Sequence, residues 1–358
     1  MRKSQTAGSL KLVISIDNAE TYKDLIVVWF AEATTKIMQN ALLKNIDQQQ
    51  LTHIANMASS SVNIKTDPSD FILLTSNDRK KINSLTLSTS IQTLQNPQQA
   101  QGVESLPPAF SLEYLEHIRK FFPQAKNKFQ KRQIIYVKKD LLALAVLGAY
   151  FTHYYKEFKD NTVCYYYILA DTLQLGAIRL HDLNNEARRM SRVLREADAS
   201  PITLYVGLAS LYANKIRQLE EGSAILTHVI ISGTRSRGGK YVNRPTLLSF
   251  DQRDLTNLAR DIRSLGWGFA IEKLVMNYPV IQSNDPEDVK RCKRVVKSFI
   301  ESLTRAVYVW HSLGDMQEIY RILRTLTSEE FNMKAHEYFK YKRSNWATIR
   351  NQLINVRI

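Results

Sequence analysis

Residues 224–250 read AILTHVIISGTRSRGGKYVNRPTLLSF, and this stretch decides the fold class. Its outer parts, residues 224–231 and 246–250, are rich in β-branched and large apolar residues, a composition that favours strands. Between them, residues 233–244 contain three glycines and four basic side chains but no acid. Two strands joined by such a segment predict a long β-hairpin with a basic tip.

The hairpin separates two kinds of sequence. Residues 1–250 mix short strand patterns with helix patterns, whereas residues 251–358 show helix patterns alone, among them a strong start signal at Asp285-Pro286-Glu287-Asp288. The sequence therefore predicts an α+β fold, with a mixed α/β N-terminal body that includes the basic β-hairpin and a helical C-terminal domain from residue 251. Residues 82–103 carry no charged side chain, and we expect an irregular excursion at about residues 82–110.

The charge of the chain points to a polyanionic partner. There are 49 Lys and Arg against 34 Asp and Glu, a net charge of +15. Residues 1–178 contain 4 Arg and 16 Lys, and residues 179–358 contain 20 Arg and 9 Lys. The planar guanidinium group of Arg binds phosphate through two hydrogen bonds and stacks on bases. A basic surface without any such partner is the alternative.

Two clusters of basic residues are our candidates for nucleic-acid binding. One is the hairpin tip, and the other is the first half of a helix predicted over residues 288–311, where the basic side chains lie largely off the apolar stripe. Clustered like charges repel each other unless a polyanion binds. On the helix, an ordinary solvated face is an equally good interpretation. The candidates are Arg235, Arg237, Lys240 and Arg244 in the hairpin, and Lys290, Arg291, Lys293, Arg294 and Lys297 in the helix.

Two further groups are weaker candidates. An Arg-rich helix predicted over residues 182–197 also contains acids, so ion pairs between neighbouring turns explain much of its charge. The aromatic residues clustered between positions 150 and 167 could stack on unpaired bases, but their apolar neighbours indicate core packing.

The sequence offers no catalytic or metal-binding motif. Cys164 and Cys292 form no CxxC pair, and none of the 7 histidines belongs to an HExxH motif or a Cys/His array. We therefore expect no enzyme activity, no cofactor and no metal. The alternative is a metal-dependent nuclease that uses Asp171, His181 and Asp182.

Cysteine usage and hydropathy suggest a compartment. Two cysteines without a disulfide framework are typical of a reduced, cytoplasmic protein. The longest apolar stretch, residues 141–151, is shorter than the roughly 20 residues that cross a bilayer. We expect no contact with membranes.

The order of these features resembles one known family. An α/β body with a basic hairpin precedes a helical module that carries WHSLGD at residues 310–315, IYRILR at residues 319–324 and TSEEF at residues 327–331. In this layout the chain resembles the large subunit of archaeal type I-A CRISPR effector (Cascade) complexes, along its whole length in element order and most specifically in residues 299–331. The family has no diagnostic catalytic motif, so the resemblance carries over no catalytic residue.

The resemblance implies a non-catalytic subunit of a guide-RNA surveillance complex in antiviral defence. Its partners would be guide RNA, target DNA and the other protein subunits of the effector complex. Base pairing by the RNA would read the target sequence, while the protein would help to recognise the short adjacent motif and to hold the opened DNA. The remaining alternative is a structural scaffold protein that packages nucleic acid without discrimination.

Overall fold

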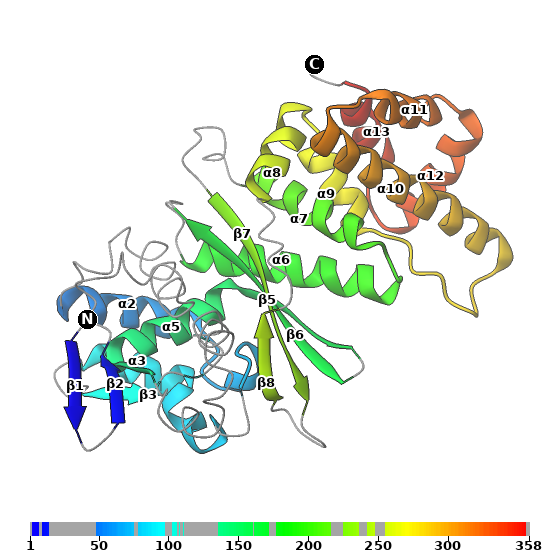
Figure 1. The fold of residues 1–358 in the computed structure, drawn as a ribbon. Coiled ribbons are helices and arrows are strands. Elements are labelled where there is room, and N and C mark those ends of the chain that lie inside the picture. The colour runs from blue at the N-terminus through cyan, green and yellow to red at the C-terminus, as the bar shows by residue number, and fades with distance from the viewer. Residues whose placement is uncertain are drawn as a thin grey trace, which may run out of the picture. The chain divides into compact units, whose positions relative to one another are not determined.

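A computed structural model shows the predicted α+β fold (Figure 1). It describes residues 2–6, 9–13, 48–74, 78–96, 102–105, 107, 110, 135–159, 161–171, 177–215, 225–235, 242–247 and 255–355. The chain forms two compact units, Met1–Asn184 with Thr227–Arg253, and Asn185–Leu226 with Asp254–Ile358. The border at residue 253 lies close to the expected border at residue 250, but residues 185–226 belong to the second unit because α7 (Pro201–Lys215) packs against its helices.

The first unit contains a small mixed sheet. Its strands are β1 (Arg2–Thr6), β2 (Ser9–Val13), β4 (Ile135–Lys138) and β3 (Val103–Ser105), in that spatial order. β2 and β4 run parallel, whereas the β1–β2 and β3–β4 pairs are antiparallel. The apolar residues that alternate from Leu10 onward favour a strand at β2, and the β-branched and aromatic residues before Lys138 favour a strand at β4.

Three helices contribute much of the core of the first unit. They are α2 (Gln48–Ser61), α3 (Leu87–Gln95) and α5 (Lys139–Thr152), and α3 packs against both of the others. Every residue of α5 from Leu141 to Thr152 is buried, which accounts for its almost wholly apolar sequence.

The expectation of an irregular excursion at about residues 82–110 is wrong. This segment includes the end of a 3-10 helix, η4 (Asp78–Leu85), then α3 and β3. Leu87, Ile91 and Leu94 lie one turn apart and are buried, while the hydroxyl of Thr86 accepts the amide hydrogen bond of Thr89 and caps α3. Helix α3 carries no charged side chain because its less buried positions are Ser, Thr and Gln.

A second sheet of the first unit has the strand order β5–β6–β7–β8. The strands are β5 (His153–Lys159), β6 (Thr162–Asp171), β7 (Ile225–Arg235) and β8 (Val242–Leu247), with antiparallel β5–β6 and β7–β8 pairs. The phenol groups of Tyr165 and Tyr167 donate hydrogen bonds to the carbonyls of Ser69 and Phe71. These bonds tie the sheet to residues 68–74, which form a 3-10 turn and a buried irregular segment.

The sequence also predicts short strands at residues 62–65 and 71–75, and both predictions are wrong for the residues that the structure describes, 62–65 and 71–74. Residues 71–74 are all buried, but they follow the 3-10 helix η3 (Pro68–Asp70) and form no ladder. Their apolar character reflects burial against the core rather than strand pairing.

The second unit is helical. Its core contains aromatic packing among Phe299, Phe331, Phe339 and Trp346. Within the described residues, no helix is long and apolar enough to span a bilayer. The helices are α6 (Ala177–Glu196, whose first turns belong to the first unit), α7 (Pro201–Lys215), α8 (Leu255–Ser264), α9 (Gly268–Met276), α10 (Glu287–Leu313), α11 (Gln317–Thr325), α12 (Glu329–Tyr341) and α13 (Trp346–Ile354).

Candidate functional site

The predicted hairpin is confirmed as an antiparallel pair of strands, but its tip is shorter than expected. The ladder runs from the Ile231–Leu247 pair to the Arg235–Val242 pair, with an irregularity between Thr234 and Arg235. The strands therefore include residues 233–235 and 242–244, which the sequence pattern places in the connecting segment. Arg235 and Arg244 lie at neighbouring positions at the end of this ladder, while Arg237 and Lys240 lie outside the described residues.

The basic residues of the α10 cluster differ in their burial and in their hydrogen-bond partners. The Nζ of Lys293 lies 2.6 Å from Oδ2 of Asp285, and Lys293 is 9% exposed. Lys293 lowers the pKa of Asp285 through this hydrogen bond, to which the amide of Gln282 adds a second. The Nζ of Lys297 donates to the carbonyl of Ala197 at 2.9 Å. Both ammonium groups thus have partners inside the helical unit.

The other three residues of this basic cluster, Lys290, Arg291 and Arg294, lie nearer to solvent. Lys290 and Arg294 lie 3.9 and 3.1 Å from the carboxylate of Glu287, an exposed acid in the first turn of the helix. Arg291 is exposed and, after Lys334, contributes to lowering the pKa of Glu330. Exposed ion pairs of this kind are weak, so Arg291 and Arg294 can still contact an external phosphate.

The acid that predicted the start of α10 has another role in the structure. Asp285 was expected to cap the helix, but the cap position is Pro286 and the helix begins at Glu287. The carboxylate of Asp285 instead accepts hydrogen bonds from Lys293 and from the amide of Gln282. The pattern of residues 285–288 located the helix start correctly to within one residue.

The residues of the alternative nuclease site lie on two elements. Asp171 ends β6, whereas His181 and Asp182 lie in α6, where Asp182 is exposed. In the described part of the chain, no group of three or more His, Cys, Asp or Glu side chains could hold a metal ion. Cys164 and Cys292 are free thiols.

The aromatic cluster serves the core of the first unit. Tyr154, Tyr165 and Tyr167 are almost fully buried, and burial raises the pKa of Tyr165 and of Tyr167 above the ordinary phenol value. Tyr154 contacts His228 through its hydroxyl at 2.8 Å, and Tyr166 donates to Glu157 at 2.7 Å. These side chains are therefore packed and hydrogen-bonded as structural residues.

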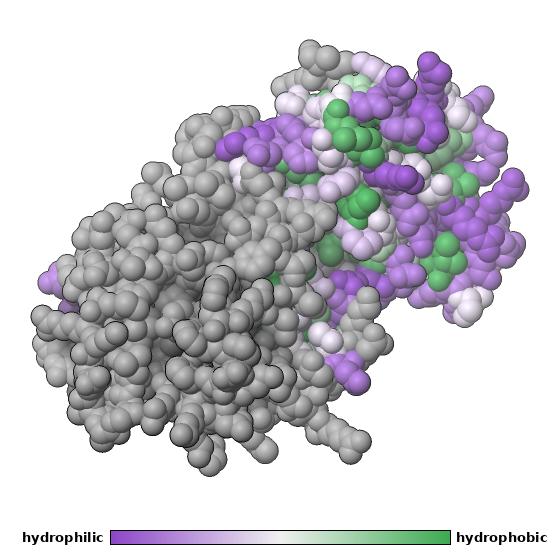
Figure 2. Space-filling model, viewed as in Figure 1, coloured by the Kyte–Doolittle hydropathy of each residue, from purple (hydrophilic) through white to green (hydrophobic). Residues whose placement is uncertain are grey.

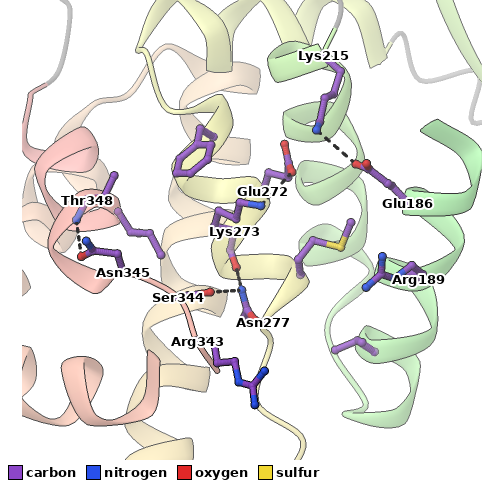
Figure 3. A pocket seen from close by; sticks show the side chains of 14 residues that line it. Glu186, Arg189, Lys215, Glu272, Lys273, Asn277, Arg343, Ser344, Asn345 and Thr348 are labelled. Carbon is purple, nitrogen blue, oxygen red and sulfur yellow. Dashed lines mark hydrogen bonds and ion pairs between the residues drawn. The ribbon is translucent and has the colours of Figure 1, made fainter. Parts of the chain in front are cut away.

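A cavity of about 560 Å³ opens in the helical unit, and the sequence patterns did not reveal it (Figure 3). Its walls come from α6, α7, α9, α13 and the turn between α12 and α13. Figure 3 shows that Arg189 and Arg343 reach it from different elements, and that no dashed line joins either one to another residue drawn. The lining residues are Glu186, Arg189, Val193, Lys215, Phe269, Glu272, Lys273, Met276, Asn277, Arg343, Ser344, Asn345, Thr348 and Ile349.

The two acids of the cavity have basic partners. Glu186 lies 3.8 Å from Lys215, and Glu272 lies 3.9 Å from Lys273. Glu272 is buried and also accepts a hydrogen bond of 2.6 Å from Asn214. With Arg189 and Arg343 added, the lining carries more positive than negative groups, so the cavity favours an anion.

The surface of the helical unit is mainly polar on the face seen in Figure 2, where apolar residues form small separate patches.

No protein-family model matches the chain, and no curated protein matches it.

Proposed function

We propose that the protein binds nucleic acid without catalysing a reaction, and that its hairpin contacts the phosphate backbone. The observation that supports this function is the β7–β8 ladder, which places Arg235 and Arg244 at neighbouring positions where the strands end. These arginines lie within residues 222–250, a span that contains no acid. A hairpin end of this kind suits a nucleic-acid groove or a single strand, because phosphate contacts position a protein on its ligand.

The first half of α10 adds a second contact in this proposal. Arg291 and Arg294 are the exposed arginines of the cluster, and their planar groups suit phosphate oxygens. Lys293 and Lys297 are left out, because their ammonium groups bind Asp285 and the carbonyl of Ala197. Lys290 is a weaker candidate for phosphate binding than the two arginines, because its side chain is partly buried and lies beside Glu287.

The narrower proposal follows from the resemblance. We propose that the bound nucleic acid is a guide RNA with its target DNA, held in a CRISPR effector complex of type I-A. The segments that carry the resemblance, residues 310–315, 319–324 and 327–331, lie at the end of α10, in α11 and at the start of α12. The partners would be the other protein subunits of that complex.

Fluorescence anisotropy with labelled duplex and single-stranded DNA or RNA tests the hairpin. In the Arg235→Ala, Arg237→Ala, Arg244→Ala triple variant we expect affinity at about 0.1 M salt to fall at least tenfold, because three phosphate contacts are lost. The matched control removes the same charge at Arg321, Arg324 and Lys340, all exposed residues of α11 and α12. If both variants weaken binding equally, net charge alone explains the affinity and the hairpin assignment is wrong.

The effector-complex proposal needs a separate experiment. Affinity purification of the chain from its native host, followed by mass spectrometry and RNA sequencing, is expected to recover a small set of protein partners together with CRISPR-derived RNA. Recovery of nucleic acid without discrete partners or guide sequences would instead support a packaging scaffold.

A further inference from the structure

Two arginines give the cavity of the helical unit its anion-binding character. Arg189 comes from α6 and Arg343 from the turn after α12, and both are exposed. Within the described part of the chain, neither guanidinium forms a hydrogen bond or an ion pair (Figure 3). Two guanidinium groups from different elements that line one cavity offer several donors to the oxygens of an anionic ligand, which favours phosphate over a single carboxylate.

The backbone around Arg343 is unusual for an arginine. Arg343 has a φ of 54°, and the amide of Ser344 bonds back to the carbonyl of Phe339 at 2.9 Å, so α12 ends in a left-handed turn. Glycine is the usual residue at such a position because a side chain is disfavoured there. The chain therefore presents a long basic side chain toward the cavity from a position where glycine would fit with less strain.

The start of α13 forms another part of the same wall. Asn345 caps this helix by accepting the amide of Thr348, and both residues line the cavity. The first amide groups of a helix have no acceptor within the helix, and its dipole adds positive potential at this end. Phosphate groups bind at helix starts for this reason. The start of α13 therefore adds positive potential to the wall that also carries Arg343.

Four apolar side chains, one of them aromatic, also line the cavity. Val193, Phe269, Met276 and Ile349 contribute side chains, and the Nζ of Lys273 lies 5.4 Å from the ring centre of Phe269. A volume of about 560 Å³ falls in the range typical of small-molecule sites and exceeds what a bare phosphate requires. The combination of cations and an aromatic wall suits a phosphate joined to a planar base.

We infer that this cavity binds a nucleotide phosphate, either in a free mononucleotide or at the end of a strand, with Arg189 and Arg343 on the phosphate and Phe269 beside the base. This site lies outside the hairpin and α10 contacts proposed above and does not depend on them. It would let the helical unit recognise one phosphorylated nucleotide rather than a length of backbone.

Calorimetry with the full chain tests the site. We expect adenosine 5′-monophosphate to bind at least tenfold more tightly than adenosine, because the phosphate supplies the contacts with the arginines. The Arg189→Gln, Arg343→Gln double variant is expected to lose at least tenfold in affinity for the monophosphate. The matched control, Arg192→Gln with Lys342→Gln, removes the same charge from exposed neighbours outside the lining and is expected to stay within about twofold.

A second variant keeps the test informative if the arginine changes disturb the fold. Phe269→Leu retains the charges, so it is expected to weaken the monophosphate several-fold and to leave inorganic phosphate unaffected. Circular dichroism and thermal melting check that each variant is folded. Equal binding of adenosine and its monophosphate, or no loss in the double variant relative to the control, would overturn the inference. Binding of an acidic peptide in place of all phosphate probes would overturn it as well.

Short oligonucleotides distinguish the two sources of the phosphate. A 5′-phosphorylated dinucleotide that competes with the monophosphate, while its 5′-hydroxyl form does not, identifies a strand end as the ligand. Competition by neither form identifies a free nucleotide. Duplex binding tests the hairpin proposal separately, because the cavity double variant and its control variant are expected to bind a duplex with equal affinity.

Discussion

At the scale of single residues, the pair formed by Lys293 and Asp285 stabilises the helical unit. Both side chains are largely removed from solvent, and their charged atoms lie 2.6 Å apart. Removing one partner of such a pair leaves the other charge without its hydrogen bond. The pair also fixes the segment before α10, because Asp285 binds the amide of Gln282 at the same time.

We predict that Asp285→Asn lowers the urea midpoint of unfolding at pH 7. Lys293 lowers the pKa of Asp285, so the pair stabilises the folded state above the unfolded carboxyl pKa, about 3.9, and this contribution disappears as the pH falls through the lower folded pKa. The difference between wild type and variant should therefore shrink below about pH 4. Equal midpoints at pH 7 would show that the pair contributes nothing measurable.

Sequence reasoning could identify basic residues but not the partners that folding gives them. Lys293 and Lys297 were grouped with Arg291 because no acid stands among them in the chain. Lys297 reaches the carbonyl of Ala197, 100 residues away, and a backbone acceptor leaves no charge signal in the sequence. The cavity was missed for a related reason, since Arg189 and Arg343 are far apart in the sequence and meet only after folding.

At the scale of elements, the close packing of α7 on α9 shapes the helical unit. A Cβ added at Gly207 would lie 2.7 Å from Cγ1 of Val275 and 2.9 Å from Sδ of Met190. Both distances are shorter than real carbon contacts allow, so glycine here permits the helices to approach. α6 and α9, which carry Met190 and Val275, also supply walls of the cavity.

Gly207→Ala is predicted to destabilise the protein by roughly 1–3 kcal/mol, because overpacking outweighs the gain in helix propensity. Chemical denaturation gives the free energy of unfolding. Val275→Ala should relieve part of the clash, so the double variant is expected to be less destabilised than the sum of the two single variants. Simple additivity would contradict the proposed contact between Gly207 and Val275.

The sequence predicted the elements that have a clear local pattern of apolar, capping or turn residues. It did not predict the segments whose conformation depends on how they are buried in the fold. The apolar run of α5, the start of α10 and the β7–β8 hairpin all agree with their patterns. The apolar residues of segment 71–74 suggested a strand, but they fill the core as an irregular segment. Helix α3 was missed because polar residues without charge were interpreted as a loop, although Leu87, Ile91 and Leu94 already showed helical spacing.

At the scale of the whole molecule, the excess of Lys and Arg is divided among different roles. Some basic side chains, such as Lys293 and Lys297, form contacts within the fold, whereas others, such as Arg291 and Arg294, are exposed. The basic residues of the hairpin lie in a span without an acid. A net charge of +15 therefore overstates the charge that can reach a ligand, and the number of phosphates actually neutralised must be measured.

The dependence of nucleic-acid affinity on salt measures that number directly. The logarithm of the binding constant falls linearly with the logarithm of the salt concentration, and each phosphate contact contributes about 0.7 to 0.9 to the slope. For the Arg235→Ala, Arg237→Ala, Arg244→Ala variant, we predict a slope that is smaller than the wild-type slope by about 2 to 2.7. An unchanged slope in that variant would contradict the assignment of the hairpin as the nucleic-acid contact.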